Sequence, residues 1–180
     1  MVSTRPLTAD DLFQLGSDAP YELIEGELIE VSPQGRVHGR ILSKLNSILD
    51  NEIVTDEMGE LLVGDVGFVL SRNPDTVLAP DLAFVRAERL RDAGDGYLEL
   101  SPDLAIEVVS PGNTLAEISR KTELYLTHGS IEVWVVRPQD REIIVHRRDG
   151  RSEIFRNGEN LSSALFPEHG IDLDRIFPIR

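Results

Sequence analysis

The chain has 180 residues, 41% of them hydrophobic and 28% charged, which is typical of one globular domain and excludes an intrinsically disordered chain. It has no cysteine, so disulfides and thiolate metal sites are excluded, and no apolar run approaches the ~20 residues that span a bilayer. The net charge of −14 argues against a general nucleic-acid binder, because such affinity rests on Lys and Arg contacts to phosphate.

The N-terminal third predicts two helices and a hairpin. A short helix is expected at residues 8–15, with Thr8 as its cap, and a hairpin at 21–31 that turns at Glu25-Gly26. Residues 35–53 predict a long helix, because apolar side chains recur at helical spacing along one side: Val37, Ile41, Leu45 and Ile48. His38 falls in the middle of this apolar side.

The same helix has an unusual charge pattern. No Asp or Glu occurs between Val31 and Leu49, where Arg36, Arg40 and Lys44 recur every four residues and form a stripe. Two interpretations remain open for these three cations, which we call the basic stripe. It is either a solvated side of the helix or an edge that contacts phosphates.

The remainder predicts a mixed sheet covered by helices. Strands are expected at 61–70, 77–85 and 104–109, then a helix at 114–128 capped by Thr114 and Glu117, then strands at 131–137, 142–147 and 152–155. The polar, Gly-rich residues 86–100 predict a loop. The order is helix, three strands, helix and strand, with extra hairpins at both ends, which indicates an α/β (α+β, mixed-sheet) fold.

Two acidic residues stand inside otherwise apolar strand segments: Asp81 in LAPDLAFV and Glu107 in PDLAIEVVS. A carboxylate there is costly to bury unless a cation meets it, so the pair indicates a divalent metal site. Simpler interpretations remain open. Asp81 follows Pro80 and could be a turn residue that accepts a backbone hydrogen bond, and Glu107 could lie on the open face of an edge strand.

Lys121 and His38 are the other candidate site residues. Lys121 lies at the border of the apolar side of its helix, which is formed by Leu115, Ile118, Thr122, Tyr125 and Leu126. From there its ammonium can reach a cleft, although an exposed pair with Glu117 is the alternative. A buried histidine of the core is the alternative for His38.

Several short segments match a known family in order and spacing: Pro80-Asp81, EVVSP at 107–111, Lys121 with Tyr125, and IEVWVVRP at 131–138. They resemble the Uma-type endonucleases of the PD-(D/E)XK, restriction-endonuclease-like superfamily. The resemblance extends from YELIEGELIEVSP through His38 to ALFPEHGIDL, so it covers nearly the whole chain.

This resemblance implies a restriction-endonuclease-like core in which Asp81 and Glu107 bind Mg²⁺, or Mn²⁺ as a substitute. It implies that Lys121 is catalytic and that His38 lines the pocket. The lysine expected two residues after the glutamate is absent, because Val109 stands there, and Lys121 on the following helix matches it instead.

We therefore expect one domain over residues 1–180, with the nuclease core at about 35–137. The expected function is Mg²⁺-dependent hydrolysis of phosphodiester bonds in DNA by a cytoplasmic homodimer that does not enter a membrane. The acidic composition leaves one alternative from another class, a non-catalytic binding module on a nuclease-like fold.

Overall fold

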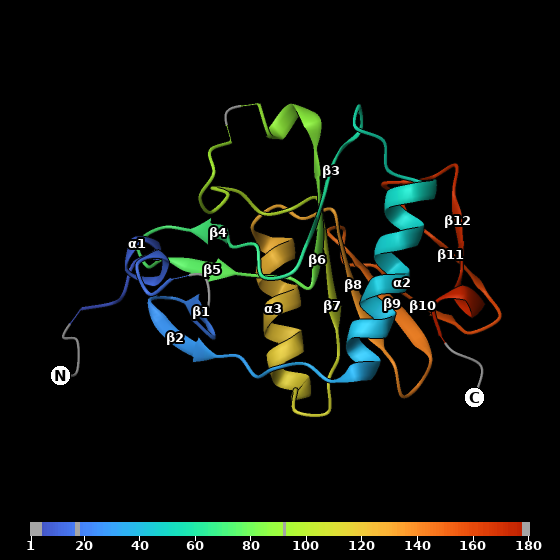
Figure 1. Cartoon of the computed structure of the whole chain (residues 1–180), viewed down its shortest axis with the longest axis horizontal. Helices are drawn as coiled ribbons and strands as arrows, with labels where there is room; N and C mark the ends of the chain where they lie inside the picture. The colour runs from blue at the N-terminus through green and yellow to red at the C-terminus, as the bar shows by residue number, and fades with distance from the viewer. Residues whose placement is uncertain (1–4, 17–18, 92, 178–180) are drawn as a thin grey trace.

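A mixed six-stranded sheet forms the centre of the protein, which is represented by a computed structural model that describes residues 5–16, 19–91 and 93–177 (Figure 1). The strand order is β10 (Ser152–Arg156), β9 (Glu142–Arg147), β8 (Glu132–Arg137), β7 (Leu104–Val108), β6 (Leu82–Arg86) and β3 (Gly59–Val63). Strands β7 and β8 are parallel and the other neighbours are antiparallel. The predicted mixed α/β fold is confirmed.

The two long helices cover opposite faces of this sheet, which Figure 1 shows nearly edge-on. Helix α2 (Arg36–Glu52) packs through Ile41 and Leu45 on the face that carries Ile106 and Trp134. Helix α3 (Leu115–Thr127) connects the parallel strands and packs on the other face, against residues such as Val133. Alternate residues of β7 and β8 therefore serve two cores, as the period of two requires.

Both helices follow the predicted ranges, but one apolar residue in each was misplaced. Val37 is 47% exposed and Leu115 is 81% exposed, so their predicted places on the buried sides were wrong. Each stands in the first turn of its helix. The predicted cap of α3 is confirmed, since Thr114 and Glu117 form a reciprocal capping box.

The N-terminal residues build a second, four-stranded sheet on the α3 side of the molecule (Figure 1). Helix α1 (Ala9–Phe13) precedes the predicted hairpin of β1 (Tyr21–Ile24) and β2 (Glu27–Glu30). Glu25 and Gly26 both have positive φ, which the tight turn requires. The sheet is completed by β5 (Thr76–Leu78) and β4 (Phe68–Ser71).

The predicted continuous strands at 61–70 and 77–85 were wrong. Each breaks in the middle, so that β3 and β6 join the large sheet while β4 and β5 join the small one. The first break is at 64–67, where Gly64 has positive φ, and the second is at 79–81, which contains Pro80. The second break brings Asp81 to the start of β6.

The C-terminal segment packs over the α2 side of the large sheet. It contains β11 (Asn160–Ser162), β12 (Gly170–Asp172) and the short 3-10 helix η2 (Leu173–Arg175), while another, η1 (Ala87–Arg89), follows β6 in the predicted loop. The expected domain limits at residues 1 and 180 lie outside the described residues. No helix in the described part of the chain is long and apolar enough to cross a membrane.

Candidate active site

The four predicted site residues meet at the end of the large sheet where β6 begins and β7 ends. Glu107 comes from β7, Lys121 from α3 and His38 from the first turn of α2. Leu82 pairs with Ile106 in the antiparallel β6–β7 ladder, so Asp81, one residue before Leu82, lies beside Glu107. Side chains from the helices on both faces of the sheet, from β7 and from the segment between β5 and β6 therefore lie together at this end.

Glu107 is buried in the middle of the sheet, which excludes an open edge strand. Its Oε1 accepts a hydrogen bond of 3.0 Å from the hydroxyl of Tyr125 and lies 2.9 Å from Nζ of Lys121. Burial is the main cause that raises the pKa of Glu107 to about 7, and the charges of Glu22 and Asp81 add to it. Lys121 opposes this rise. A further cation at the site would stabilise the ionised carboxylate.

Lys121 lies between two buried carboxylates. Its Nζ is 2.9 Å from Oε1 of Glu22, in β1, and 3.1 Å from Oε2 of Glu107. Burial lowers the pKa of Lys121, but the charges of Glu107 and Glu22 outweigh it and the net pKa is raised. The lysine is therefore a persistent cation inside the site, while Glu117 serves the helix cap.

Asp81 accepts a backbone hydrogen bond, as expected of a turn residue, and it also faces the site. Its Oδ2 accepts a hydrogen bond of 2.7 Å from the backbone N–H of Val108. The same oxygen lies 3.0 Å from Nε2 of His38, without the alignment of a hydrogen bond. The side chain of Asp81 is 20% exposed and that of His38 is 6% exposed, so solvent reaches the cluster on the side of Asp81.

Sequence reasoning did not identify Glu22 as part of this cluster, and it used Tyr125 as an apolar helix position and as part of the family match, without a role in the site. Both are buried and both contact the Glu107–Lys121 pair. Burial and the neighbouring charge of Glu107 raise the pKa of Tyr125 well above its usual value, so its hydroxyl remains a donor. The local sequence gave no signal for Glu22, because four glutamates recur in the hairpin YELIEGELIE.

A divalent cation fits the charge and the donors of the cluster. Three carboxylates and one ammonium leave two negative charges when all are ionised. The buried Nε2 of His38 has no hydrogen-bond partner among the described residues, so an ion or its water would satisfy it.

The coordination habit of magnesium also suits the cluster. No three His, Asp or Glu side chains of the described residues form a ready-made metal cage. Mg²⁺ does not require one, since it is commonly held by one or two carboxylates, waters and substrate phosphate. Asp81 and Glu107 are the two carboxylates suited to this.

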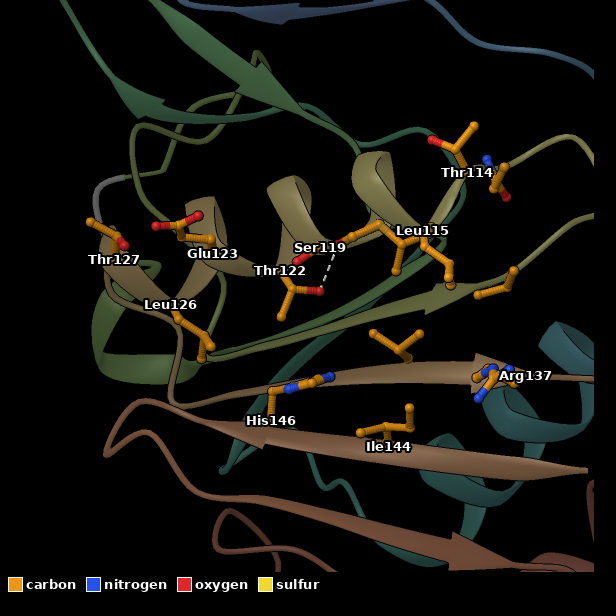
Figure 2. Close-up of a pocket in the computed structure, with 14 residues that line it drawn as sticks. Thr114, Leu115, Ser119, Thr122, Glu123, Leu126, Thr127, Arg137, Ile144 and His146 are labelled. Atoms are coloured by element: carbon orange, nitrogen blue, oxygen red, sulfur yellow. Dashed lines mark hydrogen bonds between the residues drawn. The ribbon is translucent and has the colours of Figure 1, made fainter. Parts of the chain in front are cut away.

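A separate hollow of about 410 Å³ lies on another side of α3 (Figure 2). Figure 2 shows Leu115, Thr122 and Leu126 of the helix above it, and Ile144 and His146 on strand β9 below. None of the four predicted site residues lines it. Its lining is mainly apolar, which does not suit a phosphodiester, so the chemistry is expected at the carboxylate cluster.

Comparison with known proteins agrees with this fold. A crystal structure described as "a putative nuclease belonging to DUF820 from Anabaena variabilis ATCC 29413" superimposes with a TM-score of 0.76 and 22% sequence identity. The alignment covers 96% of this chain and 98% of that one, so the two share the whole fold. Curated proteins, by contrast, yield no match.

The family comparison goes further than the fold. Residues 9–174 match the family Uma2, described as "Putative restriction endonuclease", which supports a nuclease. The match includes the strands and helices that carry Glu22, His38, Asp81, Glu107 and Lys121. Because it extends over nearly the whole sequence, the chain belongs to the Uma2 restriction endonuclease family.

Proposed function

We propose that this chain is a Mg²⁺-dependent DNA endonuclease and that Asp81 and Glu107 hold the metal, with Mn²⁺ as a possible substitute. The observation that carries the proposal is the largely buried ammonium of Lys121, 2.9 Å from Glu107, at the end of the sheet where Asp81 and His38 also meet. A purely structural cluster would have no need of a solvent-reached carboxylate next to a buried nitrogen that lacks a hydrogen-bond partner among the described residues.

Each residue of the cluster has a distinct task in this mechanism. When bound, Mg²⁺ would polarise the phosphodiester and lower the pKa of an attacking water. Lys121 stays protonated, so it stabilises the negative charge that develops on the phosphate oxygens and does not act as a base. Tyr125 orients Glu107 through its hydrogen bond, and His38 orients Asp81 or the water. Water forms a new bond to phosphorus and gives its proton to the solvent, while the bond from phosphorus to the alcohol oxygen breaks and that oxygen takes a proton from the solvent.

The direct test is nicking of supercoiled plasmid by the purified protein in Mg²⁺ or Mn²⁺. We expect nicking that EDTA abolishes and that Asp81→Asn lowers strongly. Metal-independent nicking, or equal rates for the variant, would contradict the assigned site. An inactive wild-type protein that still binds DNA would favour a binding module. Location in the cytoplasm, supported by the lack of cysteine, and a homodimeric state, measurable by light scattering, remain predictions.

The basic stripe is the surface that we propose for contact with the DNA backbone. Arg36, Arg40 and Lys44 are exposed on the solvent side of α2, and within the described residues none of them forms an ion pair. Other arginines are engaged, as Arg86 is with Asp103 and Arg147 with Glu132. With a helical rise of ~1.5 Å per residue, successive cations of the stripe stand ~6 Å apart along the axis.

Reversing all three charges of the basic stripe to glutamate should weaken DNA binding and flatten its salt dependence. Each lost phosphate contact removes ~0.9 from the slope of log affinity against log salt on duplex DNA. Fluorescence anisotropy across a salt series measures this slope. Reversal of Arg156, an exposed arginine of β10, is the control that should leave the slope nearly unchanged. A triple variant with the wild-type slope would show that the stripe is only a solvated side.

A further inference from the structure

Glu22 is a buried carboxylate that reaches the site from the other sheet. It lies in β1, is 5% exposed, and its Oε1 is 2.9 Å from Nζ of Lys121. The same oxygen accepts a hydrogen bond of 3.0 Å from the backbone N–H of Ala79. Ala79 belongs to the short break that carries Asp81. One oxygen of Glu22 therefore contacts both the catalytic lysine and the segment that presents a proposed metal ligand.

Neutralisation of Lys121 does not explain this carboxylate. Glu107 already pairs with Lys121 through both of its oxygens, at 2.9 and 3.1 Å. Removing a second carboxylate from water is costly unless it is well paired, and here it adds to the negative charge around Glu107. A buried strand position beside Leu23 and Ile24 would suit an apolar side chain better. We therefore look for the role of Glu22 in the site when the metal is bound.

We propose that Glu22 is a positioning residue, which keeps the ammonium of Lys121 in the site when the oxygens of Glu107 turn to the metal. This inference rests on the proposed function. A cation at Asp81 and Glu107 repels the ammonium and competes for the oxygens that hold it. Glu22 then remains as its partner. Glu22 is not assigned as a ligand, because its Oε1 already contacts the ammonium of Lys121 and the N–H of Ala79.

The kinetic test compares Glu22→Gln with Glu25→Gln. The amide of Glu22→Gln keeps an oxygen for the N–H of Ala79 but loses the charge, and Glu25 is a matched control in the same hairpin that pairs with Arg120 at 2.9 Å on the surface. Glu22→Gln should lower kcat by roughly 10- to 100-fold with little change in KM, the scale of a misplaced catalytic group. Glu25→Gln should match the wild type. In a Lys121→Met background, Glu22→Gln should have no further effect.

Crystals soaked with Mn²⁺ give a readout that does not depend on activity. In the wild type, Nζ of Lys121 should stay on Glu22 with the ion bound, and in Glu22→Gln it should leave the cluster while the ion remains. The role of Glu22 is overturned if the lysine does not move in Glu22→Gln, if this variant has the activity of the wild type, or if it lowers activity further in the Lys121→Met background. Each of these outcomes leaves the proposed function standing. An ion that never binds at Asp81 and Glu107 in the wild type instead overturns the proposed function itself.

Discussion

Replacing Lys121 by methionine should lower the rate of DNA cleavage by about 10²-fold or more while metal binding persists. Methionine has a similar length but no charge, so the variant loses the cation that lies 2.9 Å from Glu107 and keeps both proposed ligands. Single-turnover nicking of plasmid measures the rate. The rise in melting temperature on adding Mg²⁺ measures binding, and it should remain.

Loss of this lysine also leaves two buried carboxylates without their cation, so a folding defect must be separated from a catalytic one. The double variant Glu22→Gln/Lys121→Met removes one charge of each sign and should recover part of the stability without recovering cleavage. Arg120→Met, on the neighbouring exposed position of α3, is the matched control and should cleave like the wild type. Unchanged cleavage in Lys121→Met would make the lysine a structural counter-ion only.

The helices of this fold could be predicted from the sequence because their signals are local. The spacing of Ile41, Leu45 and Ile48 fixes the buried side of α2, and Thr114 with Glu117 fixes the start of α3. Failures occurred where the outcome depended on a partner far away in the chain. Val37 has the correct period but is 47% exposed in the folded chain.

The change of sheet in the middle of two apolar runs could not be predicted from periodicity. Residues on both sides of Gly64 and of Pro80 are mainly apolar, as in buried strands, and this pattern does not state which sheet a strand joins. This change has a direct effect on the site. It places Asp81 in an irregular segment beside the end of β7, where its carboxylate meets the N–H of Val108 and the ring of His38.

The residues of the site could be predicted only where the local sequence is unusual. Asp81 and Glu107 stand out because a carboxylate in an apolar strand is unusual, and Lys121 stands out by its angle on the helix. Glu22 does not stand out, because it is one of four glutamates in its hairpin. Only the packing of the small sheet against α3 shows that Glu22 is buried on Lys121.

Replacing Asp81 by asparagine should remove most of the stabilisation that Mg²⁺ gives to the folded protein. At ten times the dissociation constant, a ligand that binds only the folded state raises the free energy of unfolding by about 1.4 kcal/mol. For a chain of this size that is a rise of roughly 3–6 °C in melting temperature. Melting curves with and without Mg²⁺ should show this rise for the wild type and little of it for Asp81→Asn.

Without metal, the same substitution should be neutral or slightly stabilising. The amide oxygen of asparagine can still accept the hydrogen bond from Val108, while one of the charges that repel Glu107 is removed. Asp103→Asn is the matched control, because Asp103 is buried, accepts the N–H of Arg86 and pairs with Arg86 and Arg89. That variant should lose about 1 kcal/mol or more of stability and keep the response to Mg²⁺.

The two aspartate variants therefore distinguish a metal ligand from a structural carboxylate. Asp81→Asn should lose the response to Mg²⁺ and keep its stability, whereas Asp103→Asn should lose stability and keep the response. If Asp81 serves only to hold Val108, its replacement by a neutral amide should weaken this charge-assisted hydrogen bond and lower the stability, as at Asp103, with an unchanged response to Mg²⁺. Equal Mg²⁺ shifts for the wild type and Asp81→Asn would remove Asp81 from the metal site. If the melting temperature of the wild type did not rise anywhere in a full titration of Mg²⁺ and Mn²⁺, the proposed metal site would be wrong. The negative charge of the cluster would then not amount to a specific set of ligands.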